Sequence, residues 1–343
     1  MQPDPGFWAG KRVCVTGGTG FLGWHIVRQL LPIAGHVRVL GLAPASKALA
    51  KRLAGLDCIF ADVRDADAVQ AGLRDCDVVM HAAGPVAVWG RGLSEMLAIH
   101  VDGTNRVLAA LPPGARLVHT SSVVTVGASQ QHEILTETSR FNLQQLRVDY
   151  VHAKRQSEEI ALEASQRGAD VVVVNPGFLL GPEDEASVMG RFCLRFWRGH
   201  MPMIPPGGLN IVDVRDVARG HLLAAEHGRR GSRYILGGAN YTMRDFVACL
   251  SSIDPFTPPP RLSLPASVQS ALAYLAEARA VVVRREPYPS LQHARLSRFC
   301  WWYSSERAHA ELGWSARTLP ESLADTYRWF VEAGRLRRPV AVG

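Results

Sequence analysis

The sequence predicts an α/β protein with a doubly wound parallel sheet, and three features of the chain lead to this prediction. Short β-branched runs alternate with longer helical patterns through the first half. A glycine-rich turn joins the first of these runs to the first helix. The length of 343 residues exceeds what one core usually organises and leaves room for a smaller lobe. Strand–helix alternation implies parallel strands covered by helices on both faces.

The predicted elements follow one another in a regular order. We expect strands at 12–16, 37–40, 58–60, 78–81, 117–120 and 171–175. We expect the intervening helices at 21–31, 46–54, 66–74, 93–111 and 147–167.

The second half departs from this alternation. Loops rich in Pro and Gly follow Asn175, further strands are expected at 211–214 and 233–236, and the four prolines of 254–260 are typical of a rigid linker. We therefore expect a large Rossmann domain at 10–180, to which 211–238 returns. The remaining segments, 181–210 and 239–338, are expected to form a smaller C-terminal substrate lobe.

An apolar segment at 265–283 is interrupted by Gln269, Glu277 and Arg279, so it does not predict a transmembrane segment. We interpret it as a helix packed against the smaller lobe, with a membrane-surface helix as the alternative.

Composition and charge limit the classes of function. The net charge is +7, but basic residues are scattered among acidic ones, which argues against nucleic acid as a partner and is compatible with an anionic cofactor. The six cysteines lack Cys-x-x-Cys spacing and histidine pairing, so we expect no metal site and a reducing, cytoplasmic location. The N-terminus does not have the pattern of a signal peptide. Arg335, Arg337 and Arg338 are interpreted as a solvated tail.

The glycine-rich turn has the spacing of a dinucleotide site. Gly17 would make the tight turn, Gly20 would let the backbone approach a pyrophosphate, and Gly23 would allow close helix–strand packing. The pyrophosphate would lie at the helix N-terminus, where free N–H groups and the dipole favour negative charge. The cofactor residues expected around this turn and at the later strand ends are Thr16, Gly17, Thr19, Gly20, Phe21, Leu22, Gly23, Leu42, Asp62, Val63, Ala82, Ala83, Gly84 and Thr120.

The end of the second strand favours NADP(H) slightly over NAD(H). An acidic residue there would accept the ribose hydroxyl and repel a 2′-phosphate, but the chain has Gly41, Leu42 and Ala43, followed by Lys47 and Lys51. Asp62 is placed to meet the adenine, or equally to cap a turn.

Ser122, Tyr150 and Lys154 are the candidate catalytic residues. The i, i+4 spacing places Tyr150 and Lys154 on one helix face, where the ammonium is expected to lower the pKa of the phenol. The pair could then exchange a proton with a substrate hydroxyl or carbonyl. Ser122, after the fifth strand, could hydrogen-bond the reacting oxygen.

Together these residues resemble the extended short-chain dehydrogenase/reductases, which include dihydroflavonol reductases, 3β-hydroxysteroid dehydrogenases and hopanoid-associated sugar-epimerase-like proteins. The resemblance covers nearly the whole chain and extends to 175–177, 210–217, 234–238, 303–305 and 311–314. It implies that Ser122 positions the substrate oxygen, Tyr150 is the acid–base, and Lys154 holds the nicotinamide ribose. It also implies that Pro176, Gly177 and Phe178 flank the nicotinamide and that the chain forms a homodimer.

Two positions depart from the family pattern. His100 stands where an asparagine usually helps to organise a proton-relay water, and we expect either a relay member or a satisfied core histidine. Leu209 and Asn210 stand where sugar-nucleotide epimerases usually carry an arginine for the substrate diphosphate, which weakens that alternative.

The expected substrate walls are apolar, which favours a hydrophobic alcohol or ketone such as a steroid, triterpenoid, flavonoid or acyl chain. The residues expected there are Val86, Trp89, Ser122, Leu179, Phe192, Phe196 and Met203. For each apolar member, a place in the core of the lobe is the alternative. We thus expect an NAD(P)-dependent oxidoreductase, with a sugar epimerase or dehydratase and a non-catalytic cofactor-sensing protein as alternatives.

Overall fold

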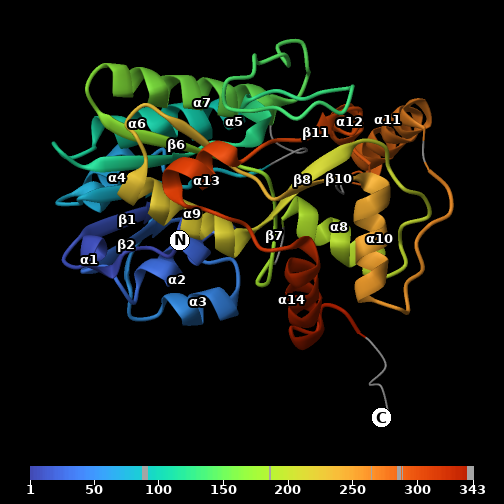
Figure 1. Cartoon of the computed structure of the whole chain (residues 1–343), viewed down its shortest axis with the longest axis horizontal. Helices are drawn as coiled ribbons and strands as arrows, with labels where there is room; N and C mark the ends of the chain where they lie inside the picture. Colours follow the sequence, from blue (N-terminus) through green and yellow to red (C-terminus); the bar gives the residue numbers. More distant parts are fainter. Residues whose placement is uncertain (87–91, 185–186, 264, 284–286, 288, 338–343) are drawn as a thin grey trace.

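The computed structural model describes residues 1–86, 92–184, 187–263, 265–283, 287 and 289–337. Its larger part is a parallel sheet with the strand order β3-β2-β1-β4-β5-β6-β9 (Figure 1). The strands are β1 (Arg12–Thr16), β2 (His36–Gly41), β3 (Asp57–Phe60), β4 (Val78–His81), β5 (Arg116–Thr120), β6 (Asp170–Pro176) and β9 (Arg233–Leu236). The predicted doubly wound fold is confirmed.

Alternate residues of the strands pack against helices on opposite faces of this sheet. Val13 and Val15 lie in one core, which they share with α2 (Phe21–Leu30) and α9 (Val214–His227). Cys14 lies in another core, with α4 (Ala66–Leu73), α6 (Gly103–Ala109) and α7 (Asp149–Gln166). Because the strands are buried on both faces, they read as near-continuous apolar runs in the sequence.

The single helix expected at 93–111 is divided in three. A π-helical turn, η1 (Ala98–Asp102), separates α5 (Leu93–Leu97) from α6. His100 lies in this turn, is buried, and donates from Nε2 to the carbonyl oxygen of Pro85 at 3.1 Å. Such turns insert one extra residue into a helix and often occur at functional sites, and apolar periodicity does not reveal them.

A second, smaller sheet forms the centre of the C-terminal lobe. It contains β7 (Phe178–Leu180), β8 (Gly208–Asp213), β10 (Ala239–Thr242) and β11 (Cys300–Trp301). The helices of this lobe are α8 (Val188–Trp197), α10 (Met243–Ile253), α11 (Ala266–Val283), α12 (Leu291–Leu296) and α14 (Leu319–Glu332). Phe196, Trp197 and Phe246 are among the buried residues of its core.

The segment 211–238 is shared between the two sheets. The strand expected at 211–214 is β8, which pairs with β7 in the smaller sheet and ends at Asp213. Val214 is helical instead, because the Asp213 side chain accepts from the Arg215 backbone N–H and caps α9. Only α9 and β9 return to the large sheet.

The segments expected as a rigid linker and as a solvated tail both contact the lobe, although Arg335 and Arg337 are exposed as predicted. In the proposed linker 254–260, Thr257 is buried and its hydroxyl donates to the Trp197 carbonyl at 3.1 Å. In the proposed tail, Leu336 is buried and the Arg335 carbonyl accepts from Arg198 at 2.6 Å. Arg338 lies outside the described residues.

Late residues of the chain return to the Rossmann domain. The Tyr303 hydroxyl donates to the Gly127 carbonyl at 2.5 Å, and the Trp314 indole donates to the Asp216 carbonyl at 2.7 Å. Trp314 follows α13 (Glu306–Leu312), which packs beside α9 and β9. The two lobes are therefore joined by several chain crossings.

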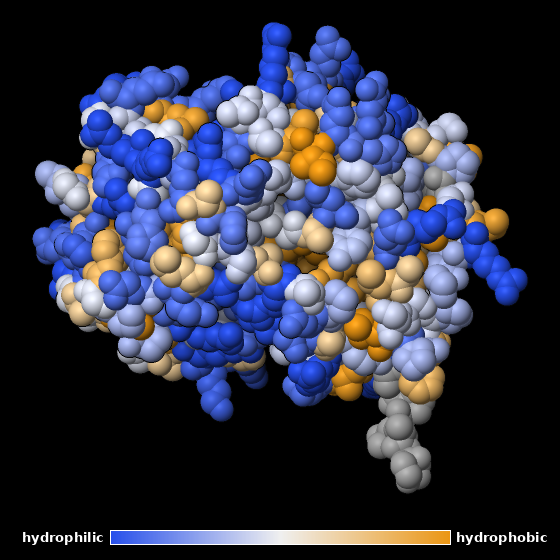
Figure 2. All heavy atoms as spheres, viewed as in Figure 1, coloured by the Kyte–Doolittle hydropathy of each residue, from blue (hydrophilic) through white to orange (hydrophobic). Residues whose placement is uncertain are grey.

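Hydrophilic residues cover most of the face shown in Figure 2, and hydrophobic residues form small, separate patches on it. Within the described parts of the chain, no helix has the length and apolar character needed to cross a membrane. The segment expected at 265–283 is α11, in which Gln269 and Ala273 are buried while Tyr274 and Leu275 are exposed.

Candidate functional site

A cavity of about 460 Å³ lies at the carboxyl ends of the parallel strands β1, β4, β5 and β6. This edge of an open α/β sheet is where such folds bind their ligands. The lining brings together the glycine turn, Thr120, Ser122, Tyr150 and Lys154. Of the cofactor residues predicted from the sequence, it includes Gly17, Thr19, Gly20, Phe21, Leu22, Gly23, Ala82, Gly84, Thr120, Tyr150, Lys154, Pro176, Gly177 and Phe178.

The glycine turn has the shape that a dinucleotide pyrophosphate needs. Gly17 has φ +70°, and a Cβ there would lie 2.7 Å from the Ala82 carbonyl oxygen. A Cβ at Gly23 would lie 2.1 Å from the Gly17 oxygen, so the turn requires glycine at both positions. Gly20 is the N-cap of α2, lines the cavity and makes no side-chain cap, which leaves the first N–H groups of the helix for an anion. The residues present therefore fit a dinucleotide.

The other predicted cofactor residues lie beside the cavity without lining it. The Thr16 hydroxyl hydrogen-bonds with His81 Nδ1 at 2.7 Å, so it braces β1 against β4. Asp62 accepts from Arg64 at 2.8 Å, and the hydrogen bond from Arg64 is the main cause of its lowered pKa. Val63 is buried, and Leu42, directly after β2, is 61% exposed. Ala83 is also absent from the lining.

Ser122, Tyr150 and Lys154 meet where β5 ends and α7 begins. Tyr150 lies in the first turn of α7, and its hydroxyl hydrogen-bonds with Ser122. Lys154, one turn later, donates from Nζ to the Thr120 carbonyl at 2.8 Å. Two neighbouring strand and helix ends thus bring a hydroxyl, a phenol and an ammonium into one cavity.

Burial shifts the pKa of both members of the pair. Burial raises the pKa of Tyr150 to about 12, with the Ser122 hydrogen bond opposing it. Burial lowers the pKa of Lys154 to about 8, with the charge of Glu158 opposing it. The expectation that Lys154 lowers the pKa of Tyr150 was wrong for this structure, because the ammonium is directed to the Thr120 carbonyl and burial dominates the phenol. Tyr150 is therefore a neutral phenol and a potential proton donor.

A buried polar cluster supports the loop that carries Ser122. Glu158, one turn after Lys154, accepts from Asn175 at 2.6 Å, from Thr125 at 2.7 Å and from Arg233 at 2.7 Å. Asn175 also donates to the Ser122 carbonyl at 3.1 Å. Because Glu158, Asn175 and Thr125 are buried, these charge-assisted hydrogen bonds resist exchange with water and hold the backbone of Ser122 in place.

His100 is a packed, neutral core residue beside the site. Burial, with a smaller contribution from Lys154, lowers the pKa of His100 to about 2. Its ring lies edge-on to Tyr150 with centroids 5.8 Å apart. A Cβ at Gly84 would lie 2.3 Å from His100 Cε1, so the ring occupies the space that a side chain after β4 would need.

The substrate residues predicted from the sequence fall into three groups. Val86, Ser122 and Leu179 line the cavity. Phe192 stacks on Phe246 and Phe196 is fully buried in the core of the lobe, because the apolar face of α8 turns toward α10. Met203, which follows α8, is also absent from the lining. Trp89 lies outside the described residues.

Several lining residues were missed by sequence reasoning. They are Trp24, Ala45, Leu49, Arg52, Val123, Val124, Glu183, Ser187, Val188 and Met189. Val188 and Met189 come from the first turn of α8, and Arg52 comes from α3 (Lys47–Leu53). No motif marks these positions, and Glu183, Ser187, Val188 and Met189 reach the cavity only through the packing of the lobe against the Rossmann domain.

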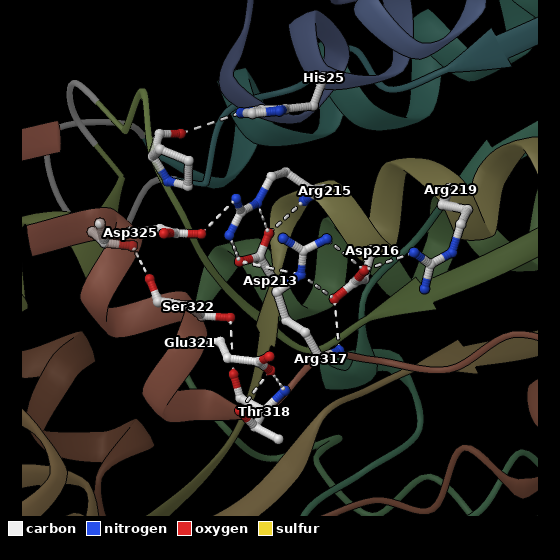
Figure 3. A network of polar contacts seen from close by, with 12 residues as sticks. His25, Asp213, Arg215, Asp216, Arg219, Arg317, Thr318, Glu321, Ser322 and Asp325 are labelled. Atoms are coloured by element: carbon white, nitrogen blue, oxygen red, sulfur yellow. Dashed lines mark hydrogen bonds and ion pairs between the residues drawn. The ribbon is translucent and has the colours of Figure 1, made fainter. Parts of the chain in front are cut away.

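A second, shallower cavity of about 710 Å³ lies away from these groups and is strongly polar (Figure 3). Asp216 pairs with Arg317 at 2.9 Å and with Arg219 at 3.0 Å, while Arg215 bridges Asp213 at 2.7 Å and Asp325 at 2.8 Å. These ion pairs tie α9 to α14 and their charges are compensated, so we assign them to the joint between the lobes. Among the described residues, no group of three or more His, Cys, Asp or Glu is arranged to hold a metal ion.

Comparison with known proteins identifies the family of this chain. The model of the NAD dependent epimerase/dehydratase family matches residues 13–237. A putative dihydroflavonol 4-reductase from Synechocystis sp. is 33% identical over 96% of this chain and 98% of its own length. Sterol demethylase protein B from Methylococcus capsulatus is 31% identical over 94% of this chain and 99% of its own.

Solved structures of similar proteins cover almost all of both chains. The crystal structure of gox2253 has a TM-score of 0.82 at 28% identity and covers 96% of this chain and 100% of that one. A nucleoside-diphosphate-sugar epimerase from Pseudomonas aeruginosa has a TM-score of 0.77 at 25% identity, with the same coverage. The chain is therefore an enzyme of the NAD dependent epimerase/dehydratase family, within the extended short-chain dehydrogenase/reductases.

Proposed function

We propose that this enzyme is an NADP(H)-dependent reductase that transfers a hydride to the ketone of a hydrophobic substrate, with Tyr150 as the proton donor. The observation that supports the proposal most directly is the meeting of Ser122, Tyr150 and Lys154 with the glycine turn in one largely apolar cavity. The dinucleotide would lie over the N-terminus of α2, with Pro176, Gly177 and Phe178 beside its nicotinamide, and would supply the hydride.

The roles of the three polar residues follow from their hydrogen bonds. Ser122 would hydrogen-bond the substrate oxygen and stabilise its developing charge. Tyr150, neutral because burial raises its pKa to about 12, would donate its proton to that oxygen. Lys154 remains charged below about pH 8 and would hold the nicotinamide ribose.

The lining supports a hydrophobic substrate. Val86, Val123, Val124, Phe178 and Met189 are among its apolar members. Lys154 and Arg52 are the positively charged side chains among the described residues that line the cavity. Arg52 forms an ion pair with Glu183 at 2.6 Å. Asn210, at the position where sugar-nucleotide epimerases usually have an arginine, is buried and bonded to Asn240 at 2.7 Å. The names of two relatives, which mention a dihydroflavonol and a sterol, are in keeping with a substrate of this kind.

Hydride transfer tests this proposal directly. We expect the purified protein to oxidise NADPH in the presence of at least one class of ketone among steroids, dihydroflavonols and β-keto acyl compounds. Intact cofactor binding with no turnover of any ketone, but with turnover of a nucleotide sugar at constant cofactor redox state, would instead favour an epimerase. The similarity to a sugar epimerase makes that alternative the second candidate.

Leu42→Asp is expected to reverse the cofactor preference. Leu42 directly follows β2 and is 61% exposed, so an aspartate there can accept ribose hydroxyls and repel a 2′-phosphate without loss of packing. The Kd for NADPH should rise by about tenfold or more, as one unfavourable charge contact implies, while the Kd for NADH should fall. Titration of both cofactors by nicotinamide fluorescence measures this. Leu42→Asn is the uncharged control, and an equal change in both variants would contradict the charge argument.

We further propose a cytoplasmic homodimer. The six cysteines are unpaired, which fits a reducing compartment. Dimer formation through a face that includes α7 is the expectation from the family, and sedimentation equilibrium of the purified protein tests it.

A further inference from the structure

One carboxylate joins the C-terminal lobe to the Rossmann domain at the rim of the cavity. Glu183 follows β7 and adopts φ +68°, a backbone conformation that is uncommon for residues other than glycine. Its side chain is 16% exposed and lines the cavity. Ser187, four residues further along the chain, is the N-cap of α8.

Three side chains of the Rossmann domain hold this carboxylate. Glu183 Oε2 accepts from Arg52 Nη1 at 2.6 Å and from Trp24 Nε1 at 2.8 Å, and Oε1 accepts from Arg28 Nη1 at 3.1 Å. The Arg52 guanidinium also lies over the Trp24 ring, 5.9 Å from its centroid. The neighbouring backbone is held too, since His25, at the top of Figure 3, hydrogen-bonds with the Pro182 carbonyl at 3.2 Å.

This cluster lies at the cavity, beside the N-terminus of α2, and not on an open surface. Arg52, Trp24 and Glu183 line the same cavity as Gly20–Gly23, where α2 presents free N–H groups to an anion. Trp24 lies on α2 itself, one turn from its N-cap. A cation at this place would add to the attraction of the helix N-terminus for a phosphate, whereas a carboxylate would oppose it.

We propose that Arg52 is a phosphate-binding residue for the cofactor pyrophosphate and that Glu183 competes with the pyrophosphate for it. This inference rests on the proposed cofactor site. In the protein without cofactor, Glu183 neutralises Arg52 and holds the lobe against α2 and α3. When the dinucleotide binds, Arg52 exchanges the carboxylate for the pyrophosphate, which accepts hydrogen bonds from a guanidinium and carries greater charge.

The chain offers variants that separate this exchange from a purely structural ion pair. Glu183→Gln keeps the shape of the side chain and removes the competing charge. We expect the Kd values for NADH and NADPH to fall together by about three- to tenfold, as loss of one partly buried competing charge implies. Arg52→Gln should raise both Kd values by about tenfold, because it removes the phosphate partner. In the double variant, the gain from Glu183→Gln should vanish.

Arg28→Gln is the matched control. Arg28 pairs with the same carboxylate but does not line the cavity, so both Kd values should stay within about twofold of the parent. All Kd values are measured on the full chain by calorimetry with NADH and NADPH, and thermal unfolding shows that each variant is folded. If Glu183→Gln does not fold, the comparison of Arg52→Gln with Arg28→Gln still tests the role of Arg52.

Each other outcome overturns part of the proposal. Unchanged or weaker binding in Glu183→Gln shows that the carboxylate does not compete. A gain that persists in the double variant shows that it acts through another group. Effects confined to NADPH assign Arg52 to the 2′-phosphate instead of the pyrophosphate. Failure of the parent protein to bind either cofactor would overturn the proposed function itself, and that result is distinct from all of these.

Discussion

Tyr150→Phe is expected to lower kcat for ketone reduction by about 10²- to 10⁴-fold, the usual contribution of a positioned proton donor. The change removes only the hydroxyl oxygen of a buried side chain on α7. That hydroxyl hydrogen-bonds with Ser122, and the ring packs in a hydrophobic core. The ring itself is retained, so NADPH binding should stay within a few-fold of the parent. Steady-state kinetics of the best ketone and calorimetry with NADPH measure the two effects separately.

Tyr241→Phe is the matched control for this substitution. Tyr241 also carries a phenol whose pKa burial raises, but it lies on β10 outside the cavity lining. The kcat of the Tyr241→Phe variant should equal that of the parent. A kcat for Tyr150→Phe equal to that of the parent would show that Tyr150 is not the proton donor. A loss of activity that follows only the loss of cofactor binding would make its role structural.

Acidification to pH 5 is expected to unfold the protein or to leave it barely stable. Burial lowers the pKa of His81 to about 3, of His100 to about 2, of His25, His221 and His293 to about 4, and of His119 well below its ordinary value. These side chains stay neutral in the folded state, while the unfolded chain binds protons as the pH falls through about 6.5. Their contribution to stability is therefore complete above about pH 6.5 and is lost below it, by about 2 kcal/mol per histidine at pH 5.

Six such residues amount to about 12 kcal/mol, which is comparable with the whole free energy of unfolding of an ordinary domain. Carboxylates whose pKa is lowered keep their contribution through most of this pH range. The pKa of Asp213 is lowered because Arg215 outweighs the opposing effect of burial, so its stabilising effect is lost only below about pH 4. Denaturant unfolding at pH 5 should therefore show an uptake of about six protons.

His119→Gln separates the histidines from a general effect of acid. His119 Nδ1 is buried without a hydrogen-bond partner, so the substitution removes a group that the fold satisfies poorly. Proton uptake on unfolding should fall by about one relative to the parent. His200→Gln, at an exposed position, should leave it unchanged. Stability that is constant from pH 8 to pH 5 would refute the neutral state of the buried histidines.

The alternation of strands and helices could be predicted because each element carries its own signal. β1, β4 and β9 begin and end where the sequence places them, since their β-branched runs are bounded by turns. The boundary between β8 and α9 was wrong by one residue, because a side-chain cap by Asp213 ends the strand. The interruption at 98–102 could not be predicted, because the helical periodicity continues through a π turn.

Only part of the candidate site could be predicted from the sequence. Gly17, Ser122 and Tyr150 stand in local motifs, and the structure places all three at one cavity. Phe196 and Met189 are both apolar residues of α8. Phe196 is fully buried in the core, whereas Met189 lines the cavity. Which face of α8 meets the cavity depends on the packing of α10 and α14 behind it, and no local pattern records that packing.

The return of late residues to the Rossmann domain has a consequence for synthesis on the ribosome. The edge strand β9 joins β6 only after residue 236 has been made, and Trp314 reaches α9 about eighty residues later. The nascent dinucleotide domain must therefore wait with an open sheet edge and an uncovered helix face while the lobe emerges. A pause or a premature stop in this interval would present unpaired strand backbone to neighbouring nascent chains, so this stretch of translation is where chaperone binding should be greatest.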